Sequence, residues 1–302
     1  MLEEVAEATA VDARRLAERW DRRPPRFADI CPNPGFQLAL LPSRFDHELF
    51  RPEGALLPGS RAHAAITRAL AHGKRNALEI GGPTDWGFTP TDYLERCDNV
   101  VERRDDRRYN PEMAPPDAQG FCDGCGDDFP YVVRERTLGT THLRDGANLT
   151  GFADHTYDLV ISSHSLEHFP DPLRAALEWH RVLRAGGYLL LVLPWSPGTF
   201  DRFRSASNFL TLAQNFVQPT RARLLFSRFD EIHGATNWDA FFSKPSPRAP
   251  AQRKPPHWQN DVHWHVFDFT CAEQLLECLG MDLEAEALVA PYHMIFVARK
   301  PQ

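Results

Sequence analysis

The chain has 302 residues, of which 42% are hydrophobic and 25% are charged, a composition that is ordinary for a globular protein. Its longest apolar run, YLLLVLPW, is far too short to span a bilayer, and its acidic N-terminus lacks the basic start and apolar stretch of a signal peptide. We therefore expect an untargeted, cytoplasmic protein. The net charge of −7 argues against a generally basic surface for nucleic acid.

Charge is unevenly distributed along the chain. Residues 196–260 contain nine lysines and arginines but four acidic residues, a local net charge of +5 that leaves −12 for the remainder. A basic segment of this kind is the one feature that would suit RNA or another anionic macromolecule. The acidic remainder of the chain argues against such a partner.

The cysteines do not form a repeated pattern. We expect them to be reduced and mostly buried thiols, and the six are Cys31, Cys97, Cys122, Cys125, Cys271 and Cys278. Two of them, Cys122 and Cys125, have the spacing of a zinc-ligand pair, but no second pair of cysteines or histidines follows at the distance of a zinc finger. A structural zinc site there is the alternative.

The N-terminal third of the chain contains two predicted helices. Apolar residues recur at helical spacing over residues 1–22, whereas residues 22–58 look loop-rich. A second helix is predicted over residues 59–74, with Ser60 as its cap and Gly73 as its stop. This helix leads directly into an apolar strand, ALEIG.

Strands and helices then alternate. A short strand is expected over residues 99–102, and the continuous apolar run at 157–163 is typical of a strand buried on both faces. Residues 171–187 have a helical pattern that ends at two glycines, and residues 188–194 form another buried strand. This β-α-β series predicts a parallel sheet with right-handed crossovers.

The series is interrupted at residues 195–262, which are rich in proline, arginine and aromatic residues. A helix resumes over residues 268–280, capped near Thr270. Two final strands, 282–290 and 292–300, are joined by a short turn and should be antiparallel to each other. We expect four parts. Residues 1–58 form an N-terminal helical and loop cap, residues 59–194 a nucleotide-binding core, residues 195–262 an insertion, and residues 263–302 the rest of the core.

Candidate ligand-binding positions follow the predicted strands. A glycine-rich turn, GGPT, ends the first strand, where doubly wound folds bind nucleotides. Glu102 ends the next strand, 21 residues after Gly81, at a place suited to an acid that binds ribose hydroxyls. Asp145, in the sequence DGANL, could place a carboxylate by an adenine amino group. The elements SSHSLEHFPDP and RVLRAGG follow in unbroken order.

With these motifs the chain resembles the class I S-adenosylmethionine-dependent methyltransferases, in the branch described as methyltransferase type 11. The resemblance implies an α/β, Rossmann-like, doubly wound and mostly parallel seven-stranded sheet with an antiparallel last strand. S-adenosylmethionine is then the cofactor and S-adenosylhomocysteine its product. Carried over to this sequence, the cofactor-binding residues are Glu79, Gly81, Gly82, Pro83, Thr84, Glu102, Asp145, Gly146 and Ser163.

Pro83 departs from the usual glycine pattern of a nucleotide loop. Proline has no N–H group and cannot take a positive φ, so this loop is not a phosphate-binding nest. A nicotinamide dehydrogenase would lose phosphate contacts at this position. S-adenosylmethionine carries no phosphate, and a rigid turn is compatible with it.

Methyl transfer from a sulfonium needs alignment of nucleophile, methyl and sulfur, and it needs a base only when the acceptor is protonated. Histidine is the natural base near neutral pH. His164, just past the end of a strand, is the first candidate, and His263 and His265 follow. A packing or hydrogen-bonding role is the alternative for each. No metal is assigned, although His164, Glu167 and His168 could converge on a divalent ion.

The acceptor site is expected in the insertion, where aromatic side chains with arginines could form a pocket for an anionic or planar molecule. The candidate substrate-binding residues are His164, Trp195, Arg202, Arg204, His233 and Trp238. The alternative is that these aromatics form a small core of their own. The predicted function is methylation of O or N on a small, polar or anionic metabolite, with no nucleic acid or membrane as partner. Methylation of RNA or protein, and a catalytically silent binding subunit, are the alternatives.

Overall fold

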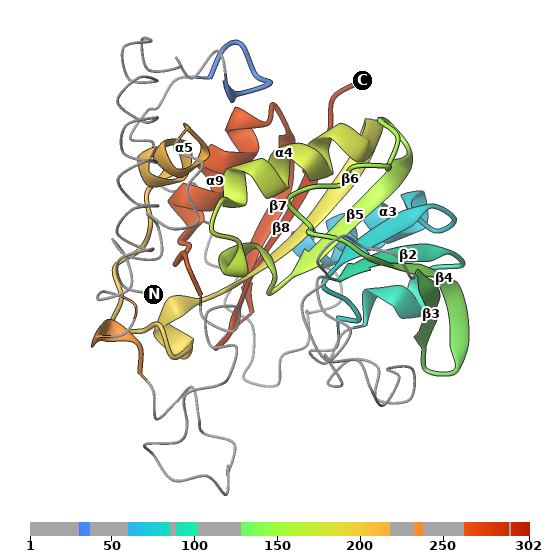
Figure 1. Cartoon of the computed structure of the whole chain (residues 1–302), viewed down its shortest axis with the longest axis horizontal. Helices are drawn as coiled ribbons and strands as arrows, with labels where there is room; N and C mark the ends of the chain where they lie inside the picture. Colours follow the sequence, from blue (N-terminus) through green and yellow to red (C-terminus); the bar gives the residue numbers. More distant parts are fainter. Residues whose placement is uncertain are drawn as a thin grey trace, which may run out of the picture.

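The computed structural model describes residues 30–36, 60–84, 89–101, 128–217, 232, 234–237, 263–289 and 291–302. Its centre is one sheet with the strand order β3-β4-β2-β1-β5-β6-β8-β7 (Figure 1). The strands are β1 (Ala77–Ile80), β2 (Cys97–Val101), β3 (Phe129–Val133), β4 (Arg136–Leu143), β5 (Tyr157–Ser163), β6 (Leu183–Pro194), β7 (Asp282–Val289) and β8 (His293–Arg299). The predicted helix at 1–22 and most of the loop-rich region 22–58 lie outside the described residues.

The sheet is mostly parallel, as predicted. Strands β4, β2, β1, β5 and β6 run parallel to one another, and the last strand, β8, is antiparallel to both β6 and β7. The sheet has eight strands rather than the predicted seven, because β3 pairs antiparallel with β4 at one edge. The turn between them, Arg134 and Glu135, has positive φ at both residues. Such a hairpin turn usually contains glycine or asparagine, so the sequence carried no strong sign of it.

Helices cover both faces of the sheet (Figure 1). Helix α3 (Arg61–His72) packs on one face against alternate residues such as Leu190 and Val192. The intervening residues Leu189 and Leu191 point to the other core, with α4 (Pro172–Val182), α5 (Phe209–Val217) and α9 (Phe269–Cys278). This two-sided burial explains the continuous apolar runs of the central strands. Three short 3-10 helices complete the described elements, namely η1 (Pro90–Tyr93), η2 (Leu166–His168) and η3 (Ser196–Gly198).

The helix caps partly follow the prediction. Ser60 caps α3, since its side chain accepts a hydrogen bond from the His63 N–H at 3.0 Å, and Gly73 ends the helix. The cap of α9 is Asp268 rather than Thr270, because the Asp268 carboxylate accepts a hydrogen bond from Cys271 N at 2.8 Å. None of the described helices is long and apolar enough to cross a membrane.

The helix predicted over 171–187 ends earlier than expected. Helix α4 stops at Val182 and β6 begins at the next residue. Pairing between β5 and β6 shifts register here, and Gly186 has φ of 76°. A Cβ on Gly187 would lie 3.0 Å from Arg184 O and 3.1 Å from Asp158 O. The two glycines therefore lie in an irregular part of strand β6 and do not end a helix.

One expectation about the cysteines is wrong. Cys31 and Cys278 form a disulfide that joins residues 30–36 to the end of α9. Asn33 strengthens this junction through hydrogen bonds to Cys278 O at 3.1 Å and Glu277 O at 2.9 Å. The fold brings together two cysteines 247 residues apart, which no local pattern indicates. Cys97 and Cys271 are buried free thiols, as expected, while residues 122 and 125 lie outside the described residues.

His180, near the end of α4, makes the stability of the fold sensitive to acid. Burial, aided by Lys300 and His155, lowers the pKa of His180 to about 4, against about 6.5 in an unfolded chain. Between these values the unfolded state binds a proton that the folded state excludes, so stability is lost as the pH falls through this window. We expect His180→Gln to reduce the drop in Tm between pH 7 and pH 5.

Thermal unfolding at the two pH values measures this effect. His72→Gln, a change at an exposed histidine of α3, is the matched control and should leave the drop as it is in the unmodified chain. An identical drop in the His180→Gln variant would contradict the assignment.

Candidate active site

The carboxyl ends of the central parallel strands meet at one edge of the sheet, and the loop after β1 lies there. Gly81 has φ of 77°, and its N–H donates to Val100 O at 2.8 Å. A Cβ on Gly81 would lie 2.4 Å from Ser165 Oγ, which itself donates to Ile80 O at 2.9 Å. Glycine is required here by the backbone angle and by the close approach of the chain after β5.

Glu79 holds the loop together from inside. Its carboxylate accepts hydrogen bonds from Thr84 N at 2.7 Å and from the Tyr131 hydroxyl at 2.5 Å. The side chain is fully buried, and this burial raises the pKa of Glu79 in spite of these hydrogen bonds. The Glu79 carboxylate and the Thr84 N–H are thus paired with each other, and this pairing shapes the loop. The resemblance implies such a role for the acid, in which it acts through the loop and not by direct contact with the ligand.

The Gly82–Pro83 peptide bond is cis, and the turn is held by β2. Gly82 N donates to Asn99 Oδ1 at 3.1 Å, and Asn99 Nδ2 donates back to Gly82 O at 3.3 Å. A Cβ on Gly82 would lie 2.4 Å from Glu79 Cδ. In the described part of the loop, residues 81–84, the backbone amides are therefore used within the protein and form no nest for a phosphate.

Two further predicted donor contacts lie along the same edge. Asp145 follows β4 in an exposed turn, where its carboxylate accepts from Ala147 N at 2.9 Å. The next residue, Gly146, is fixed by a hydrogen bond from Trp179 Nε1 to its carbonyl at 2.9 Å. Glu102 lies just outside the described residues, immediately after the end of β2 at Val101.

The end of β5 contributes Ser163 and His164. Ser163 is the last residue of the strand and is partly buried. His164 has a left-handed backbone with φ of 50°, and its Nε2 lies 2.7 Å from Nδ1 of His293 in β8. Burial, with the imidazoles of His293 and His263, lowers the pKa of His164 to about 3. The His164 ring is accordingly neutral near neutral pH.

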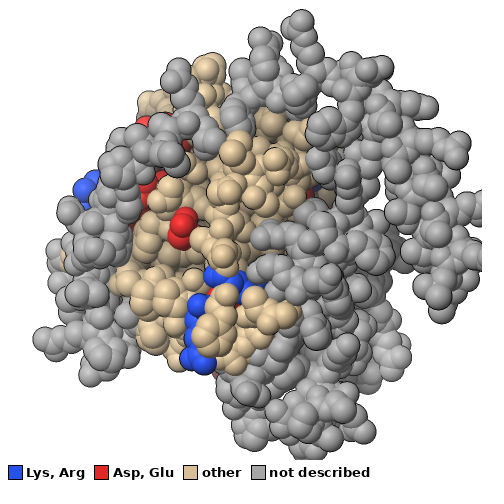
Figure 2. Space-filling view, turned by 90° about the vertical axis from the view of Figure 1, so that its left-hand side faces the viewer, with Lys and Arg blue, Asp and Glu red and all other residues tan. Residues whose placement is uncertain are grey.

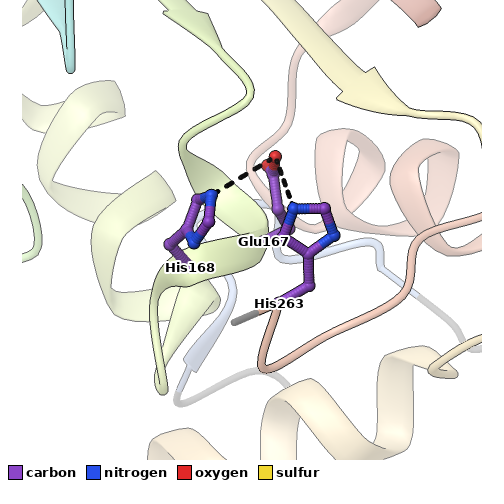
Figure 3. Close-up of side chains that lie close together, drawn as sticks. All are labelled: Glu167, His168 and His263. Carbon is purple, nitrogen blue, oxygen red and sulfur yellow. Dashed lines mark ion pairs between the residues drawn. The ribbon is translucent and has the colours of Figure 1, made fainter. Parts of the chain in front are cut away.

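Three side chains from two distant segments meet beside His164. Figure 3 shows the imidazoles of His168 and His263 on either side of the Glu167 carboxylate. Glu167 Oε1 lies 3.8 Å from His263 Nε2 and 3.9 Å from His168 Nε2. Glu167 has no exposed surface, and burial raises its pKa to about 7 although the charge of His263 opposes the rise.

His263 has a buried acid on its other side. Its Nδ1 forms a short hydrogen bond with Asp201 Oδ2, and Asp201 Oδ1 accepts from Arg204 Nη1 at 2.8 Å. The Arg204 side chain is fully buried and also donates to His263 O at 2.6 Å. Arg204 therefore supports His263 from within the protein, in contrast to the acceptor contact that the sequence suggested.

The segment HWHVF, residues 263–267, does not form a strand. It is an irregular stretch before α9, held by hydrogen bonds from Trp264 N and His265 N to Glu167 O at 2.8 and 3.3 Å. His265 is buried and contacts Ser207 and Asn215. It thus lies within the packing between this segment and α5, apart from the cluster around Glu167.

Part of the predicted acceptor region is described. Trp195 is partly buried after β6, with its N–H donating to Tyr292 O at 2.8 Å. Arg202 is exposed, and its guanidinium lies 4.6 Å from the ring centre of Phe203. The described part of the face in Figure 2 is mostly uncharged, with a small group of basic side chains and a few separate acidic ones. The predicted substrate-binding residues His233 and Trp238 lie outside the described residues.

Sequence reasoning missed two members of this site. Asp201 looked like one charge in a basic segment, and His293 looked like an ordinary residue of the last strand. Their partners, His263 and His164, are 62 and 129 residues away. The only local signal was the unusual number of histidines beside strand ends.

The comparisons with known proteins agree with this architecture. Residues 131–191, which run from β3 to β6, match the family model described as methyltransferase domain. The match confirms the predicted resemblance to the methyltransferases of this class, and with it the expectation of S-adenosylmethionine as cofactor. The matched segment contains Asp145, Ser163 and the Glu167 cluster residues of η2, but not the loop after β1.

Individual relatives match part of the chain. It is 36% identical over 125 residues to 2-methyl-6-phytyl-1,4-hydroquinone methyltransferase 2, chloroplastic, of Oryza sativa subsp. japonica, which covers 41% of this chain and 30% of that protein. It is 26% identical over 154 residues to the uncharacterized methyltransferase YcgJ of Bacillus subtilis (strain 168), covering 50% of this chain and 53% of that one. The chain thus matches about a third of the rice protein's length and about half of YcgJ.

Among solved structures, an S-adenosylmethionine-dependent methyltransferase from Mesorhizobium loti is 14% identical to this chain. The superposition covers 80% of this chain and 99% of that one, with a TM-score of 0.43.

Proposed function

We propose that this protein transfers a methyl group from S-adenosylmethionine to an oxygen or nitrogen atom of a small-molecule acceptor. The observation that carries the proposal is the loop after β1, which Glu79 and Tyr131 close from inside. In this proposal the ligand lies against the backbone of the loop, whose described amides at residues 81, 82 and 84 are used within the protein and form no phosphate nest. A phosphate-free nucleoside derivative suits it better than a dinucleotide does.

In this proposal the donor lies across the carboxyl ends of β1, β2, β4 and β5. Gly81 and Gly82 let the backbone approach its methionine part, and Glu102 binds the ribose hydroxyls. Asp145 and the Gly146 amide bind the edge of the adenine. The positive φ of Gly81 and the fixed Gly146 carbonyl support this arrangement, because both place backbone at the same edge of the sheet.

The acceptor is proposed to lie beyond the end of β5, under a cap formed by residues 1–58 and 195–262. Trp195, Arg202, His233 and Trp238 are the proposed contacts. The name of the rice relative specifies a phytyl-substituted hydroquinone, which supports a small molecule rather than a macromolecule as acceptor. Bound donor supplies an electrophilic methyl group, and the protein's task is to align acceptor and methyl and to remove the acceptor's proton. His164 is the proposed base, and its pKa of about 3 makes it a weak one near neutral pH.

The test of donor binding is calorimetry of the purified full chain with S-adenosylhomocysteine. Saturable binding supports the enzyme, whereas no binding at high micromolar ligand would favour a catalytically silent subunit. A screen of metabolite extracts with labelled donor then identifies the acceptor. Labelling of RNA or protein in place of small molecules would overturn the acceptor class, and bound nicotinamide cofactor would overturn the donor.

Glu102→Ala is expected to weaken S-adenosylhomocysteine binding by about 10- to 100-fold, because a hydrogen bond to a charged group contributes about 1.5–3 kcal/mol. The free energy of unfolding should change much less. Calorimetry and urea unfolding measure the two effects. The control is Asp282→Ala, at an exposed acid that begins β7, which should leave donor affinity unchanged. If Glu102→Ala also leaves the affinity unchanged, the ribose acid is misplaced.

A further inference from the structure

The cluster of Glu167, His168 and His263 has the residue types and the spacing of a metal-binding site. A carboxylate oxygen of Glu167 and one ring nitrogen each of His168 and His263 all lie within 4.8 Å of one another. The His168 and His263 rings are nearly perpendicular, with centroids 4.8 Å apart, so their nitrogens approach the carboxylate from different directions (Figure 3). Zinc bonds to histidine nitrogen and carboxylate oxygen are about 2.0–2.2 Å long. Small inward movements of these side chains would therefore bring all three atoms to one ion.

The Glu167 carboxylate is the least satisfied group in the cluster. Within the part of the chain that the structure describes, neither carboxylate oxygen accepts a hydrogen bond, although the residue has no exposed surface. Leaving a buried carboxylate without hydrogen bonds costs folding free energy. A bound cation would remove this cost, whereas no hydrogen-bond donor among the described residues contacts the two carboxylate oxygens.

His263 is oriented as a metal ligand is. Asp201 accepts the hydrogen bond from its Nδ1, which leaves Nε2 facing Glu167 with a lone pair. Arg204 holds the other oxygen of Asp201 at 2.8 Å. A carboxylate behind a ligating histidine is the usual second layer of such sites, because it sets the tautomer and the ring direction. Asp201 thus points to a ligand independently of the three-residue cluster.

We propose that Glu167, His168 and His263 bind one divalent transition-metal ion, with zinc as the first candidate. Two imidazoles and one carboxylate are a ligand set that zinc uses, and imidazole ligands favour transition metals over magnesium or calcium. This set differs from the combination of His164, Glu167 and His168 suggested by sequence. His164 Nδ1 also lies 3.7 Å from Glu167 Oε1, but its Nε2 is engaged with Nδ1 of His293 at 2.7 Å. The three atoms that all lie within 4.8 Å of one another belong to Glu167, His168 and His263.

The proposal does not depend on methyl transfer, and its test is metal binding by the full chain after treatment with a chelator. We expect calorimetric titration with Zn²⁺ to show one strong site per chain. Glu167→Gln and His263→Asn should each weaken this site at least about 10-fold, and Asp201→Asn by about 10- to 100-fold, as loss of a supporting carboxylate does. His72→Gln, at an exposed histidine of α3, is the control and should bind Zn²⁺ like the unmodified chain.

Two further measurements separate metal binding from folding and from the cysteines. Circular dichroism checks that each variant is folded, and His168→Asn replaces any variant that is not, since the His168 side chain is 32% exposed. The double variant Cys122→Ser/Cys125→Ser should keep the site. In the Co²⁺ form, absorbance without a thiolate charge-transfer band is expected. Zn²⁺ binding that survives in folded Glu167→Gln and His168→Asn, or that is lost with the two cysteines, would overturn the proposal.

Discussion

Replacing His164 by alanine is expected to lower turnover by about 10²-fold, the low end of the range that a general base contributes, because its pKa of about 3 makes it a weak base. S-adenosylhomocysteine affinity should stay nearly unchanged, because the donor contacts proposed at Gly81, Glu102 and Asp145 are untouched. His164 lies directly after β5, with its N–H donating to Val192 O at 2.9 Å. Its position is thus tied to the sheet.

The backbone at His164 requires a second variant. With φ of 50°, alanine is strained at this position, whereas asparagine tolerates the left-handed conformation better. His164→Asn should therefore lose as much turnover as His164→Ala while losing less stability. Full activity in either variant would leave His164 with a packing role alone.

His293 allows a finer distinction. Its Nδ1 lies 2.7 Å from His164 Nε2, so it orients the ring from the neighbouring part of the sheet. We expect His293→Asn to lower turnover less than His164→Asn does, since the positioning partner is lost but the base remains. An equal loss in both variants would instead indicate that the two imidazoles act as a unit.

Trp179→Ala is expected to lower the free energy of unfolding by about 3–5 kcal/mol, the usual cost of removing a large aromatic side chain from a core. Trp179 lies in α4, has no exposed surface and packs edge-on against Phe169 with ring centroids 5.8 Å apart. Its indole also donates to Gly146 O. The substitution therefore removes both core volume and the hydrogen bond that holds the turn after β4.

Urea unfolding measures this loss, and Trp179→Phe is the matched control. Phenylalanine keeps most of the ring volume but not the indole N–H, so it should cost about 1–3 kcal/mol, the price of an unsatisfied buried acceptor. Equal losses in the two variants would show that the hydrogen bond outweighs the packing. A loss below about 1 kcal/mol in Trp179→Ala would contradict the described core.

Local sequence patterns were sufficient for much of the fold. Apolar runs located β1, β5 and β6, and the antiparallel pairing of the last two strands followed from the short connection between them. The patterns were insufficient where a residue served a different element. The glycines at 186 and 187 looked like a helix end but form an irregularity in β6, because their contacts are with β5 and with the chain end.

The candidate site divides in the same way. The position of the glycine turn after β1 could be predicted because Glu79, Gly81 and Gly82 belong to or directly follow a strand, and the geometry of this turn depends mainly on the local backbone. The sequence indicated His263 as a candidate site residue, but it did not indicate which residues contact His263. Asp201 and Glu167 contact His263 from two separate segments. Hydrogen bonds from the backbone N–H groups of residues 264 and 265 to Glu167 O hold His263 next to Glu167.

The sequence by itself determined the strands β1, β2, β5 and β6 of the parallel core, the antiparallel pair at the end of the chain, and the loop in which Pro83 disfavours a phosphate ligand. These features arise from periodicity and backbone restriction, which act over a few residues. The same patterns showed no sign of β3, β4 or α5. Only the tertiary structure decided that Cys31 pairs with Cys278, that Arg204 is an internal support, and that Glu167 meets His263. Those contacts join segments from about 60 to about 250 residues apart, and such pairings depend on how the whole sheet and its helices pack.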